Sequence, residues 1–261
     1  MVTKLILFDK IYNISSERQK KDIFKRYKKY LNQLIRGFSH TSIELGKLRE
    51  SDSRVEILIE GPEEEFVKNL LEAEIGRFIK FNEIKKGVVL KGTLVNVGKV
   101  GFGLFLDCGI IDPPTDVLIP LYKLRNQLAD EKKVSLKKII NTYDFINHFP
   151  LFIKIIGIDD KEKNLEGEIA ENSLSLYKKV VEENIEALFL CGETKAQFKN
   201  ALIKKGHLQD IISFKRYGFL EHLVLLKKGT NARGIISEIG RFLEGCKFSI
   251  LSAKRIRKLK S

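Results

Sequence analysis

Cysteine and histidine are scarce in this sequence, which limits the metal and redox chemistry that it can carry. The 261 residues include three cysteines and four histidines. Cys108, Cys191 and Cys246 are far apart, and no C-x-x-C spacing occurs. Neither a disulfide framework nor a zinc site is therefore expected. Single thiols in apolar surroundings are typical of a reducing cytoplasm. We expect no metal and no cofactor.

The sequence also lacks the local motifs of common enzyme sites. Its four histidines lie in different predicted elements, without H-x-x-H or H-E-x-x-H spacing. The pair Asp159-Asp160 falls in a lysine-rich turn, where aspartate is ordinary turn chemistry. The glycines of 98–103 do not form the G-x-x-x-x-G-K-S/T loop that cradles phosphates. We therefore expect a protein that is not an enzyme.

Long hydrophobic segments are missing as well. No apolar run approaches the roughly 20 residues that a transmembrane helix needs. The apolar stretch Leu5–Phe8 is too short for the core of a signal peptide. We expect a cytoplasmic protein without a membrane partner.

Positive charge is abundant and unevenly distributed. The net charge is +13 and the isoelectric point is near 9.5, which favours a polyanionic partner. Residues 179–261 hold 17 basic and 8 acidic groups, a net of +9, whereas 1–84 and 85–178 each have a net of +2. The surplus therefore indicates a binding surface in the C-terminal third.

A glycine-punctuated stretch, Lys91–Gly109, dominates the centre of the chain. Apolar and polar residues alternate there, and glycines interrupt the run at 92, 98, 101, 103 and 109. Glycine inside such a pattern indicates a bulge or a close backbone approach. Further strands are predicted at 115–119, 150–158 and 165–169, with a helical segment before the second of these. Five strands with this spacing predict a closed barrel of the OB type.

The run Phe102-Gly103-Leu104-Phe105-Leu106-Asp107 resembles the second strand of S1-type RNA-binding domains. Gly92 fits the glycine early in that family's first strand. The resemblance implies that Phe102 and Phe105 face the groove and stack on bases. We expect Lys91, Lys99 and Arg125 to assist them. Where the family often has a histidine after its third strand this chain has Pro120, and the basic residue that often begins the last strand is Asn164. Glu166 and Glu168 follow.

The flanking segments predict two α/β domains. Residues 1–84 give the order β-α-β-β-α-β, the split βαβ of ferredoxin-like folds. Val180–Cys191 fits either a helix or a strand, and if Ala187–Leu190 is a strand, residues 179–253 give the same order. In the first domain the fourth strand is expected within Arg77–Phe81. The complete prediction is an α+β chain of a ferredoxin-like domain (1–84), an S1-like OB barrel (85–178), a second ferredoxin-like domain (179–253) and a projecting basic tail (254–261). The whole order is similar to an uncharacterised archaeal family with a central S1-like module.

The basic residues of the C-terminal third suggest phosphate contacts. Lys227 and Lys228 precede a predicted helix that Thr230 would cap, and free N–H groups at a helix start favour anions. Arg233 and Arg241 would extend this surface. The tail would add further contacts through Lys254, Arg255 and Arg257.

These observations favour a non-enzymatic RNA-binding protein of translation or RNA processing that binds ribosomal RNA, tRNA or single-stranded RNA. The alternative is an adaptor subunit of the transcription or ribosome-assembly machinery, in which a degenerate barrel contacts protein. Association with the ribosome or with RNA polymerase fits either hypothesis.

Overall fold

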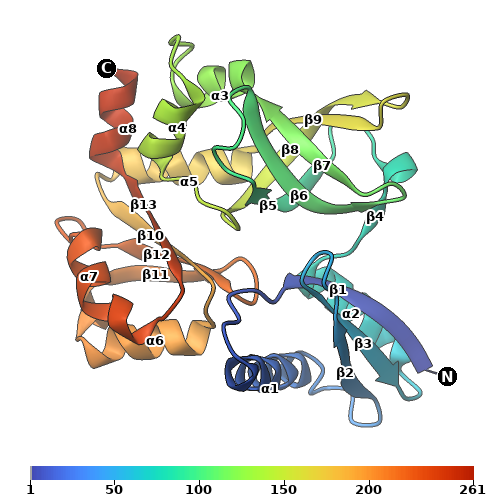
Figure 1. Ribbon diagram of the computed structural model, residues 1–261. Helices are drawn as coiled ribbons and strands as arrows, with labels where there is room; N and C mark the ends of the chain where they lie inside the picture. The colour runs from blue at the N-terminus through green and yellow to red at the C-terminus, as the bar shows by residue number, and fades with distance from the viewer. Residues whose placement is uncertain (1) are drawn as a thin grey trace. The chain divides into compact units, whose positions relative to one another are not determined.

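The computed structural model of the protein describes residues 2–261, which divide into two compact units (Figure 1). The first unit runs up to Arg77 and also includes Gly218–Leu220, and the second holds the remaining residues. Among the residues described, no helix combines the length and the apolar character that crossing a bilayer requires.

The first unit is a three-stranded antiparallel sheet with two helices. Its elements are β1 (Val2–Lys10), α1 (Glu17–Leu34), β2 (Ser42–Leu48), β3 (Arg54–Glu60) and α2 (Glu64–Ile75), and the strand order is β1-β3-β2. Helix α1 starts at Ser16, whose hydroxyl accepts a 3.2 Å hydrogen bond from the Gln19 N–H. The apolar stripe of α1 buries Ile23, Tyr27 and Leu31, as its 3.6-residue period predicts.

The prediction that a fourth strand within 77–81 completes this sheet is wrong. Strand β4 (Ile79–Lys80) pairs in parallel with strand β6 of the second unit, so that Ile79 lies opposite Ile110. Phe81, in the short 3-10 helix Phe81–Glu83, is buried in the core of the second unit. Because Ile79 and Phe81 both pack against the core of the second unit, the first unit ends at Arg77 and not at residue 84.

Three residues from much later in the chain complete the first unit. Phe219 and Leu220 are buried in its core, and the Phe219 ring lies 4.6 Å from that of Tyr27 between centroids. The Phe219 N–H donates to Asp9 Oδ1 at 3.1 Å.

The centre of the second unit is a closed five-stranded barrel with OB strand order. Its elements are β5 (Val89–Val95), β6 (Gly103–Ile111), β7 (Thr115–Pro120), α3 (Leu121–Leu128), α4 (Leu136–Tyr143), β8 (Pro150–Asp159) and β9 (Asn164–Ile169). Strand β5 pairs with β6 and β8, β6 pairs with β7, and β9 pairs with β8 and, in parallel, with β7. The pairings close the barrel and confirm the predicted fold.

Two of the barrel glycines occupy positions where a side chain would collide with a neighbouring strand. A Cβ atom on Gly92 would lie 2.6 Å from Cys108 Sγ, and one on Gly103 would lie 2.5 Å from the Ile119 carbonyl oxygen. These glycines therefore permit the close backbone approach that a tightly curled sheet requires.

The remainder of the second unit has the predicted ferredoxin-like strand order. Its elements are α5 (Glu171–Glu182), β10 (Glu186–Cys191), α6 (Lys195–Lys204), β11 (Ile211–Arg216), β12 (Glu221–Leu226), α7 (Ala232–Ile239), β13 (Lys247–Ser252) and α8 (Ala253–Lys260), with 3-10 turns at His207–Asp210 and Gly240–Phe242. The antiparallel order is β11-β12-β10-β13.

This C-terminal sheet is covered on both faces (Figure 1). Leu188, Val224 and Ile250 pack with helices α6 and α7, whereas Phe189, Leu223 and Leu251 belong to the same core as the barrel. Burial of both faces explains why β10 and β12 are continuous apolar runs, a pattern that does not distinguish a strand from a buried helix.

The basic C-terminal segment is helix α8 and not a projecting tail. Ile256 and Leu259 are buried in the core shared by the barrel and the C-terminal sheet. Their spacing places both on one face of the helix, with the basic residues on the others.

Candidate nucleic-acid interface

Phe102 and Phe105 form an aromatic pair on the outside of the barrel. Along β6, Leu104 and Leu106 point into the core, so Phe105 points outward between Val95 of β5 and Leu118 of β7. Phe102 precedes the strand and is 57% exposed. The two rings meet edge to face, with centroids 6.0 Å apart. An exposed ring braced by a second, half-buried one is a platform on which a planar base can stack.

Tyr122, which the sequence analysis did not single out, extends this aromatic surface. It lies in the first turn of α3 and is 58% exposed. The N–H of the preceding Leu121 donates to the Phe102 carbonyl oxygen at 2.8 Å, which places Tyr122 near the Phe102 end of β6. The Lys123 ammonium lies 5.8 Å from the Tyr122 ring centroid and 3.1 Å from Glu168 Oε2.

The three basic residues predicted to assist the aromatic pair have different positions. Lys91 is on β5 opposite Phe152, and Lys99 is exposed in the turn between β5 and β6. Arg125 is on α3, where its Nε donates to the Val134 carbonyl oxygen at 2.8 Å. Arg125 therefore braces the connection between α3 and α4, and only the two lysines lie on the strands and turn of the aromatic surface.

The start of α7 is already occupied by oxygen atoms of the protein. Asn231, and not the predicted Thr230, is the N-cap, and its Oδ1 accepts from the N–H groups of Arg233 and Gly234. Glu186 Oε2 accepts from the Ala232 N–H at 2.9 Å. The first N–H groups of α7, which the sequence suggested as an anion site, therefore already donate to Asn231 and to the Glu186 carboxylate.

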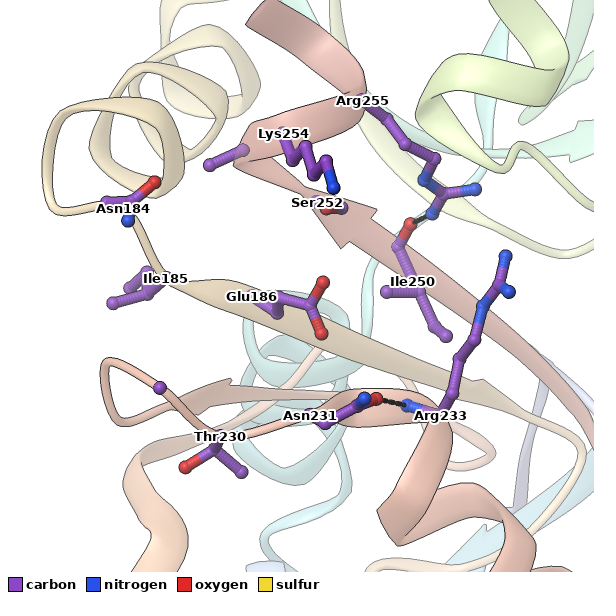
Figure 2. Close-up of a pocket in the computed structure, with 12 residues that line it drawn as sticks. Asn184, Ile185, Glu186, Thr230, Asn231, Arg233, Ile250, Ser252, Lys254 and Arg255 are labelled. Atoms are coloured by element: carbon purple, nitrogen blue, oxygen red, sulfur yellow. Dashed lines mark hydrogen bonds between the residues drawn. The ribbon is translucent and has the colours of Figure 1, made fainter.

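A cleft beside α7 nevertheless gathers several predicted residues. It has a volume of about 570 Å³ and lies between the starts of β10 and α7 and the junction of β13 with α8. Figure 2 shows Arg233, Lys254 and Arg255 around the opening, together with Glu186. Among the described residues, the Arg233 and Lys254 side chains have no hydrogen-bond or ion-pair partner. Lys227 and Lys228 are exposed in the preceding turn and do not line the cleft.

The two arginines of α8 hold the helix in place. Arg255 donates to the carbonyl oxygens of Asn141 and Ile250, and its guanidinium lies 3.7 Å from Asp144 Oδ2. Arg257 donates to Asn184 Oδ1 at 2.6 Å and to the Val181 carbonyl oxygen. Both arginines, which were predicted to contact phosphates, therefore donate to oxygen atoms of the protein.

Arg241 lies apart from the cleft, in the 3-10 turn after α7. Its guanidinium carbon is 5.0 Å from the ring centroid of Phe242, which is 40% exposed. Phe242 could not be singled out from the sequence, because its position between Arg241 and Leu243 gave no sign that the ring would be exposed.

Within residues 2–261, no group of three or more His, Cys, Asp or Glu side chains could hold a metal ion. Burial raises the pKa of the Cys191 thiol well above its usual value, and burial together with Glu193 raises that of Cys246 to about 12. Both thiols are therefore protonated, unreactive groups at neutral pH.

Comparison with solved structures gives matches of low identity. The chain is similar to uncharacterized protein MJ1198 from Methanocaldococcus jannaschii, with 10% identity over 34% of this chain and 95% of that one and a TM-score of 0.23. It is also similar to GSP13 from Bacillus subtilis, with 14% identity over 34% of this chain and 58% of that one and a TM-score of 0.22. A third similar structure is the intact alpha subunit of aIF2 from Pyrococcus abyssi, with 10% identity over 64% of this chain and 97% of that one and a TM-score of 0.25. These scores carry no weight for function, and the barrel is assigned from its own strand order.

Family comparison is more informative. The comparison with curated proteins gives no match. Residues 84–181 match the DUF2110 central domain, which contains the barrel with its aromatic pair. Residues 186–251 match the DUF2110 C-terminal domain, which contains the four-stranded sheet. Over more than half of its length, the chain thus carries the central and the C-terminal domain of the DUF2110 family.

Proposed function

We propose that the protein binds RNA without catalysing a reaction, and that the outer surface of the barrel holds the bases. The observation that carries this proposal is the aromatic surface of Phe102, Phe105 and Tyr122. Val95 and Leu118 flank Phe105, so a stacked base would also cover apolar surface that is now in contact with water. Stacking on aromatic side chains is worth roughly 1–3 kcal/mol per base and tolerates any sequence.

Basic residues would hold the phosphates. Lys91 and Lys99 lie on the strand and turn beside the aromatic surface, and the cleft presents Arg233 and Lys254. Because these groups act mainly through charge, they give affinity and not sequence preference. Ribosomal RNA and tRNA, in translation or RNA processing, are the partners that suit a protein with a net charge of +13.

Fluorescence anisotropy with a short unstructured RNA and an RNA hairpin, across a salt series, tests the proposal. We expect log-linear weakening with salt. We also expect Phe102→Ala to weaken binding by about 5–150-fold, which is the stacking energy of one base. The side chain is 57% exposed, so the free energy of unfolding should change little. Val2→Ala, at an equally exposed apolar residue of the first unit, is the control. Unaltered affinity in Phe102→Ala and Phe105→Ala would overturn the assignment to the barrel.

One observation favours the alternative, a protein adaptor with a degenerate barrel. Glu166 and Glu168 lie on β9, and Glu168 pairs with Lys123 beside the aromatic surface. Carboxylates there repel phosphates. An adaptor would show no RNA binding at low salt and would co-purify with one defined protein complex.

A further inference from the structure

Phe242 is surrounded by positive charge on a surface that the proposed function does not use. Three cationic groups approach its ring: Lys204 Nζ at 5.4 Å, Lys205 Nζ at 6.0 Å and the Arg241 guanidinium carbon at 5.0 Å from the centroid. The lysines come from the end of α6, and the arginine adjoins Phe242 in the turn after α7. The fold thus brings together residues nearly 40 positions apart.

The charges of this group are not balanced by carboxylates. In the part of the chain that the structure describes, none of the three cations has an ion-pair partner. Glu238, on the adjacent helix, lies 3.6 Å from His207 Nε2. The ring attracts each cation through its negative face, yet three like charges around one ring repel one another. An added anion would relieve that repulsion.

We infer that Phe242, Lys204, Lys205 and Arg241 form a second RNA-contacting surface, which we name the Phe242 surface. The ring remains 40% exposed, so a base can stack on its uncovered part while the cations hold the flanking phosphates. An acidic protein segment would satisfy the charges but would make no use of the exposed aromatic ring. The inference concerns the same class of ligand as the proposed function and rests on it in that respect.

The Phe242 surface and the barrel lie on opposite sides of the C-terminal sheet. Helices α6 and α7 cover the sheet face that contains Leu188 and Val224, whereas the barrel shares its core with the opposite face (Figure 1). We therefore expect that a short RNA bound to the barrel does not contact Phe242. Only a longer or folded RNA contacts both surfaces at once.

The experiment compares the binding of two RNAs by the full chain. One has about six nucleotides, within the roughly 4–16 that one OB barrel occupies, and the other about 30. The double variant Lys204→Gln/Arg241→Gln should bind the short RNA as the wild type does. For the long RNA, its slope of log K against log salt should be shallower by about 1.4, because two phosphate contacts are lost. Lys137→Gln/Lys199→Gln, which removes two exposed lysines elsewhere on helices of this unit, should leave the slope unchanged.

Two further variants separate the ring from its charges. Phe242→Leu keeps an apolar side chain but removes the ring, so its affinity for the long RNA should fall at least fivefold, the loss that corresponds to one base stack. Phe242→Trp keeps an aromatic ring and should bind the long RNA as the wild type does. Wild-type binding of the long RNA by every Phe242-surface variant, together with weakened binding by Phe102→Ala, would overturn this inference and leave the proposed function intact. The reverse pattern would support the Phe242 surface and remove the barrel from the proposed function.

Discussion

Glu186 Oε2 lies 2.9 Å from the backbone nitrogen of Ala232, so a carboxylate from the start of β10 closes the N-terminus of α7. The contact joins residues 46 positions apart. It places negative charge where the helix dipole favours it. The same contact uses a donor that a phosphate would otherwise take.

Glu186→Gln should therefore destabilise the fold, because it removes the charge and keeps an acceptor. We expect the free energy of unfolding to fall by about 0.3–1 kcal/mol, measured by urea denaturation. Glu162→Gln, in the exposed turn before β9, is the control and should have no effect. Unchanged stability in Glu186→Gln would mean that the carboxylate does not hold α7 in solution.

Gly103→Ala should strain the barrel where β6 meets β7. The added Cβ would lie 2.5 Å from the Ile119 carbonyl oxygen, which belongs to the backbone and cannot move aside cheaply. Overpacking of this kind costs about 1–3 kcal/mol, so the urea midpoint should fall. Gly101→Ala is the matched control, since nothing lies within 4 Å of its added Cβ. Equal stability of the two variants would contradict the close approach.

Ile256→Ala should show that α8 is part of the core. The side chain is 1% exposed, and truncation of a buried isoleucine costs about 2–5 kcal/mol. Lys258→Ala, on the exposed side of the same helix, should change stability by less than about 0.5 kcal/mol. A projecting tail would instead make both substitutions neutral by thermal or urea unfolding.

Alkaline pH should destabilise the protein through buried hydroxyl and thiol groups. Burial raises the pKa of Tyr177 well above its usual value and that of Tyr217 to about 12. Burial, with a contribution from Glu193, also raises the pKa of Cys246 to about 12. The folded chain keeps these protons at pH values where the unfolded chain has released them. Stability is therefore fully present below the unfolded pKa values, about 8.5 for thiols and 10 for phenols, and falls as pH rises toward 12.

Tyr177→Phe tests this pH dependence. The Tyr177 hydroxyl makes no hydrogen bond within the described structure, so the variant should be as stable as the wild type at pH 7, or more stable. Above pH 9 its stability should decline less steeply, measured as the urea midpoint against pH. Tyr122→Phe, at an exposed tyrosine, should follow the wild-type curve. Parallel curves for Tyr177→Phe and the wild type would exclude Tyr177 as a contributor.

Much of the fold of the second unit can be predicted from local sequence. Alternation with glycines at 92 and 103 predicts a curled sheet, and the order of the C-terminal elements predicts a ferredoxin-like sheet once Ala187–Leu190 is taken as a strand. Strand β4 cannot be predicted in this way, because two residues carry no period and the contact between Ile79 and Ile110 decides their partner. The prediction of a projecting tail in place of helix α8 was wrong because basic residues outnumber Ile256 and Leu259 there, although those two residues have helical spacing.

The site is predictable only where its residues are close together in the sequence. Phe105 faces outward by alternation with Leu104 and Leu106, and Phe102 lies in the turn immediately before the strand. Tyr122 and Phe242 became candidates only through exposure, which depends on tertiary packing. Glu186 binds the first N–H group of α7, and Arg255 and Arg257 donate to backbone carbonyl oxygens. These contacts join residues distant in sequence, so local sequence patterns do not predict them.

The shared core of the barrel and the C-terminal sheet limits how freely either domain could be exchanged for an unrelated one. Phe189, Leu223 and Leu251 face the barrel side of the sheet. A recombination event that joined this sheet to an unrelated barrel would leave them in water, with the aggregation that exposed apolar patches bring. Each of the two DUF2110 domains therefore supplies part of the hydrophobic core of the other.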